Sequence, residues 1–361
     1  MLDPSPVQRI GGYIGTAWDI STWAYLAMLS VVVVSRMSDG SAPVFLQPLQ
    51  AGFPIVAGPV WIVLAVAVLT RRWLQVPLCL ILAVGFVAAV SPARQRVAPP
   101  YWVAGAPTVR VAAANVYFAN TTPDTAARSL LARDPDVIVV AEFTGTFRAA
   151  FNRAGVADRY PNVSERPRDD PAGAVIYSKL PFAEVRELTE LKMPAVRLIL
   201  PAGGYLWVAA VHPFPPTGET EGKRWMRCLK DLRRFAEGTA GDDPLAMVGD
   251  FNGTRWQPSF GQLLAGSTVD AHEALGKGLS RSWPAGRAFP RLVRLDHALI
   301  NERAFPVAIQ DFEVPGSDHR AFDVTIAVRS IKAPGVLPGE DSIVGSTVGA
   351  STSTRKPGKS R

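Results

Sequence analysis

The stretch "MVGDFNGTRWQPSF", residues 247–260, is the part of this sequence that decides the fold. It begins in an apolar run and then turns polar, with Asp250 and Asn252 separated by one aromatic residue. Because Asp, Asn and Gly are the usual residues of turns, the stretch taken alone indicates a strand that runs into a turn. Where the backbone stays extended, however, Asp250 and Asn252 point to the same side. The residues that end the other apolar runs of the chain decide whether this stretch is only a turn or also part of a functional site.

Polar side chains also end the other apolar runs of the chain. Each one has an ordinary explanation, because a lone histidine after a strand is more often a core or surface residue, and Asn or Asp often forms a turn or a cap. Taken together they indicate a functional site, since ligand sites of α/β sheets gather at strand ends. The residues are Asn115, Glu142, His212, Asp296, Asp318 and His319.

Carboxylates, amides and histidines in this combination are the groups that phosphoester cleavage requires. In-line cleavage needs charge neutralisation on the non-bridging oxygens and a positioned nucleophile. Mg²⁺ prefers oxygen ligands and is usually held by one or two carboxylates, and a bound metal polarises the phosphoryl group or activates a water. Amide and histidine donors complete a pocket for the developing charge. The sequence therefore predicts a site for Mg²⁺, with Mn²⁺ as the alternative.

The order of these motifs resembles a known family. The segments "GAVIYSKLPF", "VHPFPP", "GDFN", "RLDH" and "SDH" follow Asn115 and Glu142 as they do in the endonuclease/exonuclease/phosphatase superfamily. The resemblance covers about residues 108–328. It implies a DNase I-like fold, which is a two-sheet α/β sandwich with the site at one edge of the sheets.

The resemblance also implies catalytic roles for five residues. Asp250 resembles the carboxylate that orients or deprotonates the attacking water. Asn252 would bind a phosphoryl oxygen, and His212 would donate to the phosphate in the transition state. Asp296 and His319 would form a histidine–carboxylate pair.

Three further residues resemble the family's metal contacts. Glu142 resembles the metal-binding carboxylate, with Asn115 beside it, and Asp318 would be a second contact. The sequence departs from nuclease members, which often have Gln where Ala141 stands and Tyr where His212 stands. These departures argue against a DNA substrate but leave the chemistry unchanged.

Local patterns support a sheet-based α/β or α+β domain over residues 108–329. Strand-like runs recur, with helical stretches between some of them. Thr122 followed by Pro123 predicts a helix that reaches about Arg133. A second helix is predicted over residues 221–237. The two cysteines lie far apart in sequence and provide no disulfide framework.

The first 93 residues have the composition of a membrane anchor. Residues 53–70 and 74–93 are uncharged runs long enough to cross a bilayer, and three residues join them. Residues 20–35 form a shorter run between Asp19 and Arg36, which gives two to three predicted spans. Because short Arg-rich loops stay cytoplasmic, the hairpin tip places the catalytic domain outside the cytoplasm in a multi-pass protein of the cell membrane.

Two segments flank the predicted catalytic domain. Residues 94–107 are rich in Pro, Ala and Arg, which indicates a linker. Residues 330–361 lack the large apolar residues that a core needs, which predicts a disordered tail. The last seven residues carry four of the chain's positive charges and no negative one. The net charge of +7 is therefore weak evidence for nucleic-acid binding.

These features predict a membrane-anchored, metal-dependent phosphoesterase whose partners are the lipid bilayer and a phosphorylated, lipid-linked substrate. The layout also resembles bacterial members linked to glycopeptide-antibiotic resistance, whose outward-facing domain acts on a lipid-linked pyrophosphate. One alternative is a tethered extracytoplasmic nuclease or nucleotide phosphatase, although nucleic acid is the less favoured partner. Another is a catalytically silent binding module. The sequence identifies no protein partner.

Overall fold

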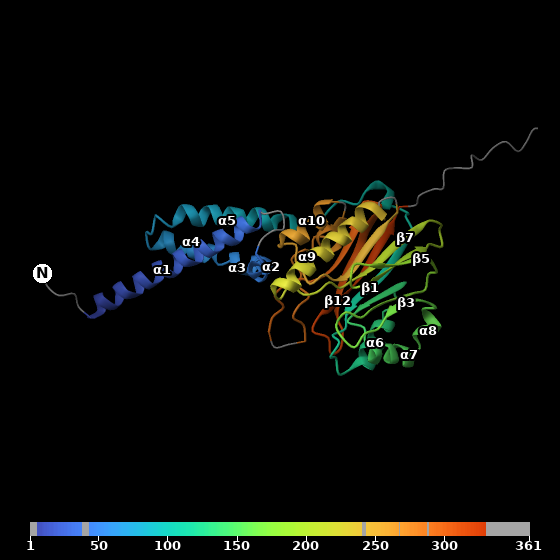
Figure 1. Cartoon of the computed structure of the whole chain (residues 1–361). Coiled ribbons are helices and arrows are strands. Elements are labelled where there is room, and N and C mark those ends of the chain that lie inside the picture. Colours follow the sequence, from blue (N-terminus) through green and yellow to red (C-terminus); the bar gives the residue numbers. More distant parts are fainter. Residues whose placement is uncertain (1–5, 38–42, 240–242, 267, 287–288, 330–361) are drawn as a thin grey trace, which may run out of the picture. The chain divides into compact units, whose positions relative to one another are not determined.

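Two six-stranded sheets form the domain that follows the N-terminal helices (Figure 1). This structure is a computed structural model, and it describes residues 6–37, 43–239, 243–266, 268–286 and 289–329. The predicted tail at residues 330–361 therefore lies outside the described residues.

The first sheet has the strand order β11-β12-β1-β2-β4-β3. Its central pair, β1 and β2, is parallel, and the remaining neighbours are antiparallel. The carboxyl ends of β1 and β2 therefore lie side by side. The strands are β1 (Thr108–Asn115), β2 (Val137–Ala141), β3 (Asn162–Arg166), β4 (Ala174–Ser178), β11 (Ala304–Glu313) and β12 (Arg320–Val328).

The second sheet has the order β5-β6-β7-β8-β10-β9 and repeats this arrangement. Its central pair, β7 and β8, is again the parallel one. In the antiparallel pair of β8 and β10, Asp250 lies directly opposite Asp296. The strands are β5 (Phe182–Leu188), β6 (Met193–Ile199), β7 (Tyr205–Val211), β8 (Leu245–Asp250), β9 (Thr268–Asp270) and β10 (Asp296–Asn301).

Alternation along the strands builds the core, because one set of side chains faces the other sheet and the next set faces a layer of helices. Val109, Val111 and Ala113 of β1 pack between the sheets, whereas Ala114 packs against helices. Helices cover both outer faces (Figure 1). They are α6 (Pro123–Ala132), α7 (Gly145–Arg153) and α8 (Val156–Arg159) on the first sheet, and α9 (Glu219–Arg234) and α10 (Pro258–Gly266) on the second.

Both predicted helices are present. Helix α6 begins at Pro123 after Thr122, as the cap and the proline indicate. Helix α9 begins at Glu219, two residues earlier than predicted, and continues as a π-helical turn over Phe235–Thr239. A last short helix, α11 (Ala271–Ala274), is capped by Asp270, whose side chain accepts hydrogen bonds from the backbone N–H groups of His272 and Glu273.

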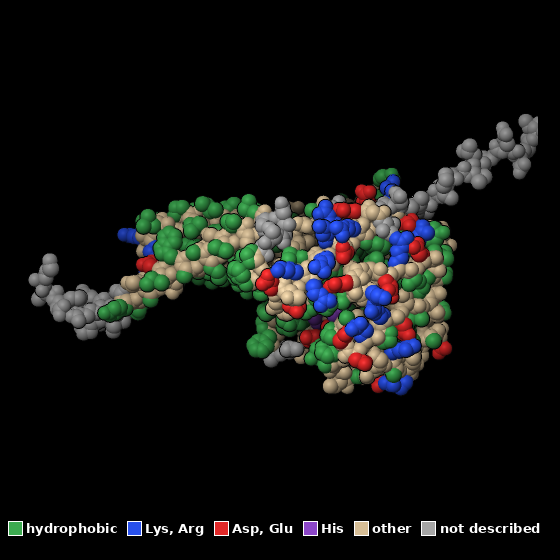
Figure 2. Space-filling view, viewed as in Figure 1, with side chains coloured by type: hydrophobic (Ala, Val, Ile, Leu, Met, Phe, Trp, Pro, Cys, Tyr) green, Lys and Arg blue, Asp and Glu red, His purple; other side chains and the backbone are tan. Residues whose placement is uncertain are grey.

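The N-terminal region consists of α1 (Pro6–Ser35), α2 (Gln47–Ala51), α3 (Phe53–Ala57), α4 (Val60–Leu69) and α5 (Val76–Val90). Two windows, Tyr13–Ser35 and Val76–Arg94, are long and apolar enough to cross a membrane. Apolar side chains cover this region, whereas charges of both signs cover the sandwich domain (Figure 2). These helices therefore support membrane association.

The predicted span at residues 53–70 differs from the straight helix that its composition suggests. Phe53–Leu69 reaches span length only together with Val44–Ala51, across a bend of 75°. Pro48 and Pro54 lie in the first turns of α2 and α3, with Gly52 between them. Proline lacks the backbone N–H that would continue a helix, so the chain turns at this point.

Candidate active site

Six central strands bring together the polar residues that the sequence singles out. The first sheet supplies Asn115 at the end of β1, Glu142 after β2 and His319 before β12. The second supplies His212 after β7, Asp250 at the end of β8 and Asp296 at the start of β10. The two parallel pairs therefore aim their carboxyl ends at one place, as expected for a site at a sheet edge.

Asn115 holds two carboxylates together. Its Nδ2 donates to Glu142 Oε1 over 2.8 Å and to Asp250 Oδ2 over 3.0 Å. Its Oδ1 accepts from the backbone N–H of Tyr117 over 2.9 Å. Since the carbonyl oxygen is used by the backbone, the Asn115 side chain positions the carboxylates.

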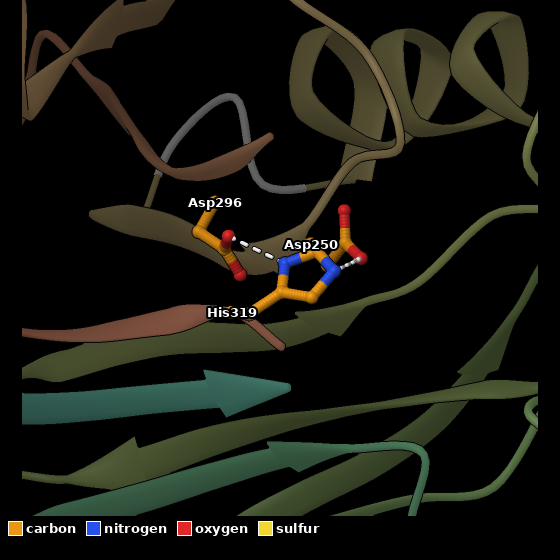
Figure 3. Close-up of side chains that lie close together, drawn as sticks. All are labelled: Asp250, Asp296 and His319. Atoms are coloured by element: carbon orange, nitrogen blue, oxygen red, sulfur yellow. Dashed lines mark hydrogen bonds and ion pairs between the residues drawn. The ribbon is translucent and has the colours of Figure 1, made fainter. Parts of the chain in front are cut away.

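His319 lies between the carboxylates of Asp296 and Asp250 (Figure 3). Its Nδ1 is 2.8 Å from Asp296 Oδ2, and its Nε2 is 3.6 Å from Asp250 Oδ2. Ser282 Oγ accepts from the backbone N–H of Asp296 over 3.2 Å. Ser317 Oγ accepts from the N–H of His319 over 3.0 Å. Backbone contacts thus fix both members of the predicted histidine–carboxylate pair.

The charges of this pair stabilise one another. Burial alone would lower the pKa of His319, but the carboxylates of Asp296 and Asp250 outweigh it and raise the pKa to about 10. Burial would likewise raise the pKa of Asp296, but the charge and hydrogen bond of His319 lower it. Burial does raise the pKa of Asp250, against the opposing charge of His319. His319 is therefore a cation that faces the cleft at neutral pH.

The "GDFNG" segment has a backbone that few other sequences would permit. Gly249 has φ +138°, and a Cβ there would lie 2.3 Å from the carbonyl oxygen of Val211. A Cβ at Gly253 would lie 2.5 Å from Cζ2 of Trp225. Asn252 has φ 47°, in the left-handed region. The opening stretch is therefore both a turn and a part of the site.

The remaining predicted residues also reach this place. His212 Nε2 is 3.7 Å from both Glu142 Oε1 and Asp250 Oδ2. Asn252 donates from Nδ2 to the carbonyl oxygen of Pro213 over 3.0 Å, which ties the loops after β7 and β8 together. Asp318 lines the same cleft. Glu142, with φ 59°, accepts on Oε2 from the backbone N–H of Phe118 over 2.7 Å.

The donor atoms fit a divalent cation. Possible ligand atoms of Asp250, Asp296 and His319 lie within 4.8 Å of one another, but the charged ring of His319 can only donate, so the carboxylates are the ligands available to an ion. Glu142 and Asp250 converge on a single amide nitrogen, an arrangement of like charges that a nearby positive charge stabilises. Carboxylate oxygens are the ligands that hard cations such as Mg²⁺ prefer. The carboxylates of the site are therefore suitable ligands for a divalent cation such as Mg²⁺.

A cleft of about 1030 Å³ opens over these side chains. Its wall includes six of the eight predicted residues, whereas Asn115 and Asp296 lie behind it and hold residues that line it. Three arginines and four aromatic side chains also line the cleft. They are Arg166, Arg168, Arg224, Tyr117, Phe118, Phe214 and Trp283.

A second buried histidine–carboxylate pair lies outside the cleft wall. His297 follows Asp296 in "RLDH", but its Nδ1 is 2.5 Å from Asp270 Oδ2. Its Nε2 lies 3.1 Å from the carbonyl oxygens of Gly253 and Arg294. The pleat of β10 turns neighbouring side chains to opposite faces, so Asp296 and His297 serve different networks.

Comparison with known proteins supports the fold. The profile described as the Endonuclease/Exonuclease/phosphatase family matches residues 112–319. D. rerio TDP2 complexed with single strand DNA product is similar in structure, with 17% sequence identity and a TM-score of 0.51 over 61% of this chain and 98% of that chain. The endonuclease/exonuclease/phosphatase from Bacteroides vulgatus has 15% identity and a TM-score of 0.50, over 62% and 99%. No curated protein sequence matches this chain. The predicted DNase I-like sandwich is confirmed.

Proposed function

Because the chain belongs to the endonuclease/exonuclease/phosphatase family, we propose that it is a membrane-anchored, Mg²⁺-dependent phosphoesterase that hydrolyses lipid-linked phosphate esters or pyrophosphates. Members of this family are hydrolases that act on phosphodiester bonds. The observation that carries the proposal is the convergence of Glu142, His212, Asp250 and His319 in one cleft.

Glu142 is the proposed carboxylate for Mg²⁺, with Asn115 holding it in place and Asp318 as a second contact from the cleft wall. The ion, when bound, would neutralise charge on the non-bridging phosphoryl oxygens. Glu142 suits this role because the backbone N–H of Phe118 and the amide of Asn115 fix both of its oxygens. A fixed carboxylate needs little reorganisation on binding.

The other residues act on the phosphate and on the attacking water. Asp250 is proposed to orient the water and accept its proton, since its carboxylate faces both histidines. His319, held by Asp296, donates from Nε2 to a phosphoryl oxygen. His212 and Asn252 donate to the charge that develops in the transition state. Asp296 acts by keeping the His319 ring oriented and charged.

The helices that precede the domain are the reason for proposing a lipid-linked substrate. The windows at Tyr13–Ser35 and Val76–Arg94 are of membrane length. Holding a catalytic site at a bilayer raises its effective concentration toward substrates that reside there. The Arg-rich tip between α4 and α5 supports an extracytoplasmic site. A cysteine introduced into the C-terminal tail should react with an impermeant reagent on intact cells, and protection would reverse this orientation.

One substrate panel tests the function. The purified full chain is assayed with undecaprenyl pyrophosphate, a phospholipid and single-stranded DNA under one Mg²⁺ condition. We expect phosphate release from a lipid-linked substrate. Cleavage of DNA alone would favour the tethered nuclease, for which the arginines and aromatic rings of the cleft offer backbone and stacking contacts. Turnover of none of the three would support the silent binding module.

A further inference from the structure

One wall of the catalytic cleft comes from the N-terminal helices. The bent segment of residues 47–57, comprising α2, Gly52 and α3, is called the elbow here. It contributes Gln47, Pro48, Ala51, Gly52, Ile55 and Val56 to the same cleft that holds His212 and Asp250. The region that provides the membrane helices is therefore part of the surface that a substrate meets.

The "GDFNG" loop continues directly into the contacts that hold the elbow. Thr254 Oγ1 donates to the carbonyl oxygen of Ala51, at the end of α2 where the chain bends, over 3.2 Å. Gln257 Nε2 donates to Gln47 Oε1 over 2.7 Å, and both side chains are buried. The segment that carries Asp250 and Asn252 thus also fixes the elbow.

An apolar cluster reinforces this attachment. Trp256 packs in a cluster formed by the N-terminal helices, and its ring centroid lies 6.1 Å from that of Phe53. The carbonyl oxygen of Trp256 accepts from Arg36 Nε over 2.9 Å. The guanidinium carbon of Arg36 lies 3.9 Å from the centroid of the Phe53 ring. The elbow is therefore packed against the domain by polar and apolar contacts.

The cleft presents both charged and apolar surface. Ile55, Phe118 and Leu292 line it and are 42%, 41% and 43% exposed, so apolar area faces the open space. Arg166 also lines it, and its Nη1 is buried without a hydrogen-bond partner among the described residues. Uncovered apolar groups gain by binding hydrocarbon, and a guanidinium nitrogen without a hydrogen-bond partner gains by binding an anion.

The apolar part of the cleft is continuous with the helices of membrane length. Val56 lines the cleft and also packs against the cluster that contains Leu26 and Leu29 of α1 and Leu82 of α5. A hydrocarbon chain on the elbow would therefore lie next to helices that are themselves suited to lipid.

We infer that the elbow is the specificity-determining wall of the cleft and binds the hydrocarbon group attached to the reacting phosphate. The inference rests on the proposed function and adds the residues that recognise the hydrocarbon chain of the phosphate or pyrophosphate ester. Ile55 contacts the chain next to the phosphate, and Arg166 contacts the anionic head. Catalysis itself stays with the strand-end residues.

A series of alkyl phosphates of increasing chain length, from butyl to hexadecyl, tests this inference. The full chain is assayed in detergent with Mg²⁺, as wild type and as Ile55→Gln. Ile199→Gln is the matched control, because Ile199 is 41% exposed and lies on β6 outside the cleft. A soluble reporter, p-nitrophenyl phosphate, measures catalysis without a hydrocarbon chain.

For the wild type we expect kcat/KM to rise with chain length. Ile55→Gln should lower kcat/KM for the longest phosphate about tenfold, the loss expected when one large apolar contact is removed. Its effect on kcat/KM for the soluble reporter, which carries no hydrocarbon chain, should be much smaller, and Ile199→Gln should change neither value. Reporter hydrolysis with no dependence on chain length, or an equal effect of both variants, would overturn the inference and leave the proposed function standing. Hydrolysis of no phosphate by the wild type would overturn both.

Discussion

The two ends of the cleft are built in opposite ways. At one end, six strand ends deliver charged and amide side chains whose chemical type alone suggests a role. At the other end, the elbow delivers aliphatic residues that resemble any membrane segment. Strand pairing sets where the residues of the catalytic end lie, whereas the elbow is held to the domain by contacts that include hydrogen bonds from Thr254 and Gln257. The difference shows that catalysis and substrate selectivity can come from two regions of one cleft. Polar residues at strand ends mark the first region in the sequence, whereas the second has only the composition of a membrane helix.

The largest expected effect concerns the catalytic end as a whole. EDTA should abolish hydrolysis of every substrate, because the proposed Glu142 site would lose the ion that neutralises the phosphate. Added Mg²⁺ should restore it, and phosphate release before and after addition is the measurement. Circular dichroism should stay unchanged, since the sheets do not depend on the ion. Activity that persists in EDTA would argue for a metal-free route.

The two histidine–aspartate pairs allow a sharper test of the same end. His319→Ala should lower kcat by about 100-fold to 1,000-fold while the chain stays folded, because it removes a donor to the developing charge. His297→Ala should instead lower the unfolding temperature, at a cost of about 2–4 kcal/mol for a buried, hydrogen-bonded ring.

Turnover numbers and thermal unfolding of both variants check this contrast. The structure supports it because His319 lines the cleft, whereas His297 packs against Phe260, with ring centroids 4.6 Å apart. Equal losses of turnover at both positions would show that the two pairs act as one unit.

The smallest expected effect concerns how the elbow is held. Thr254→Val keeps the side-chain shape but removes the hydrogen bond to Ala51, which is worth about 1 kcal/mol, together with the 3.3 Å contact that Oγ1 accepts from the backbone N–H of Trp256. The expected result is a rise of about fivefold in KM for a long-chain phosphate with little change in kcat. Thr268→Val is the matched control, because Thr268 Oγ1 also donates to a backbone carbonyl, that of Leu263, outside the cleft. A similar rise in both variants would mean that general destabilisation, rather than the elbow, raises KM.

The sandwich could be predicted because its sequence signals are local. Thr122 and Pro123 mark the start of α6, and the polar strand ends mark the carboxyl edge of the parallel pairs. The shared edge of the sheets predicts that Asn115, Glu142 and Asp250 lie close together. It does not predict which of their atoms form hydrogen bonds or at what distances.

Other features could not be predicted because they depend on tertiary contacts. The burial of Trp256 among the N-terminal helices has no periodic pattern of its own. Arg166 lies in an ordinary polar strand, and only the folded chain brings it into the cleft. Strand alternation separates Asp296 from His297, but only the folded chain brings Asp270 to His297.

The central claim is that the strand-end cluster hydrolyses phosphate esters, and the turnover number of Asp250→Asn tests it most directly. Asn keeps the size of the side chain and an acceptor for the backbone N–H of Asn252, now 2.7 Å from Asp250 Oδ1, so the chain should stay folded. The substitution removes the carboxylate that is proposed to orient and deprotonate the attacking water. We predict a loss of at least about 1,000-fold in kcat on the substrate that the wild type hydrolyses best. A folded Asp250→Asn protein with wild-type turnover would contradict the account.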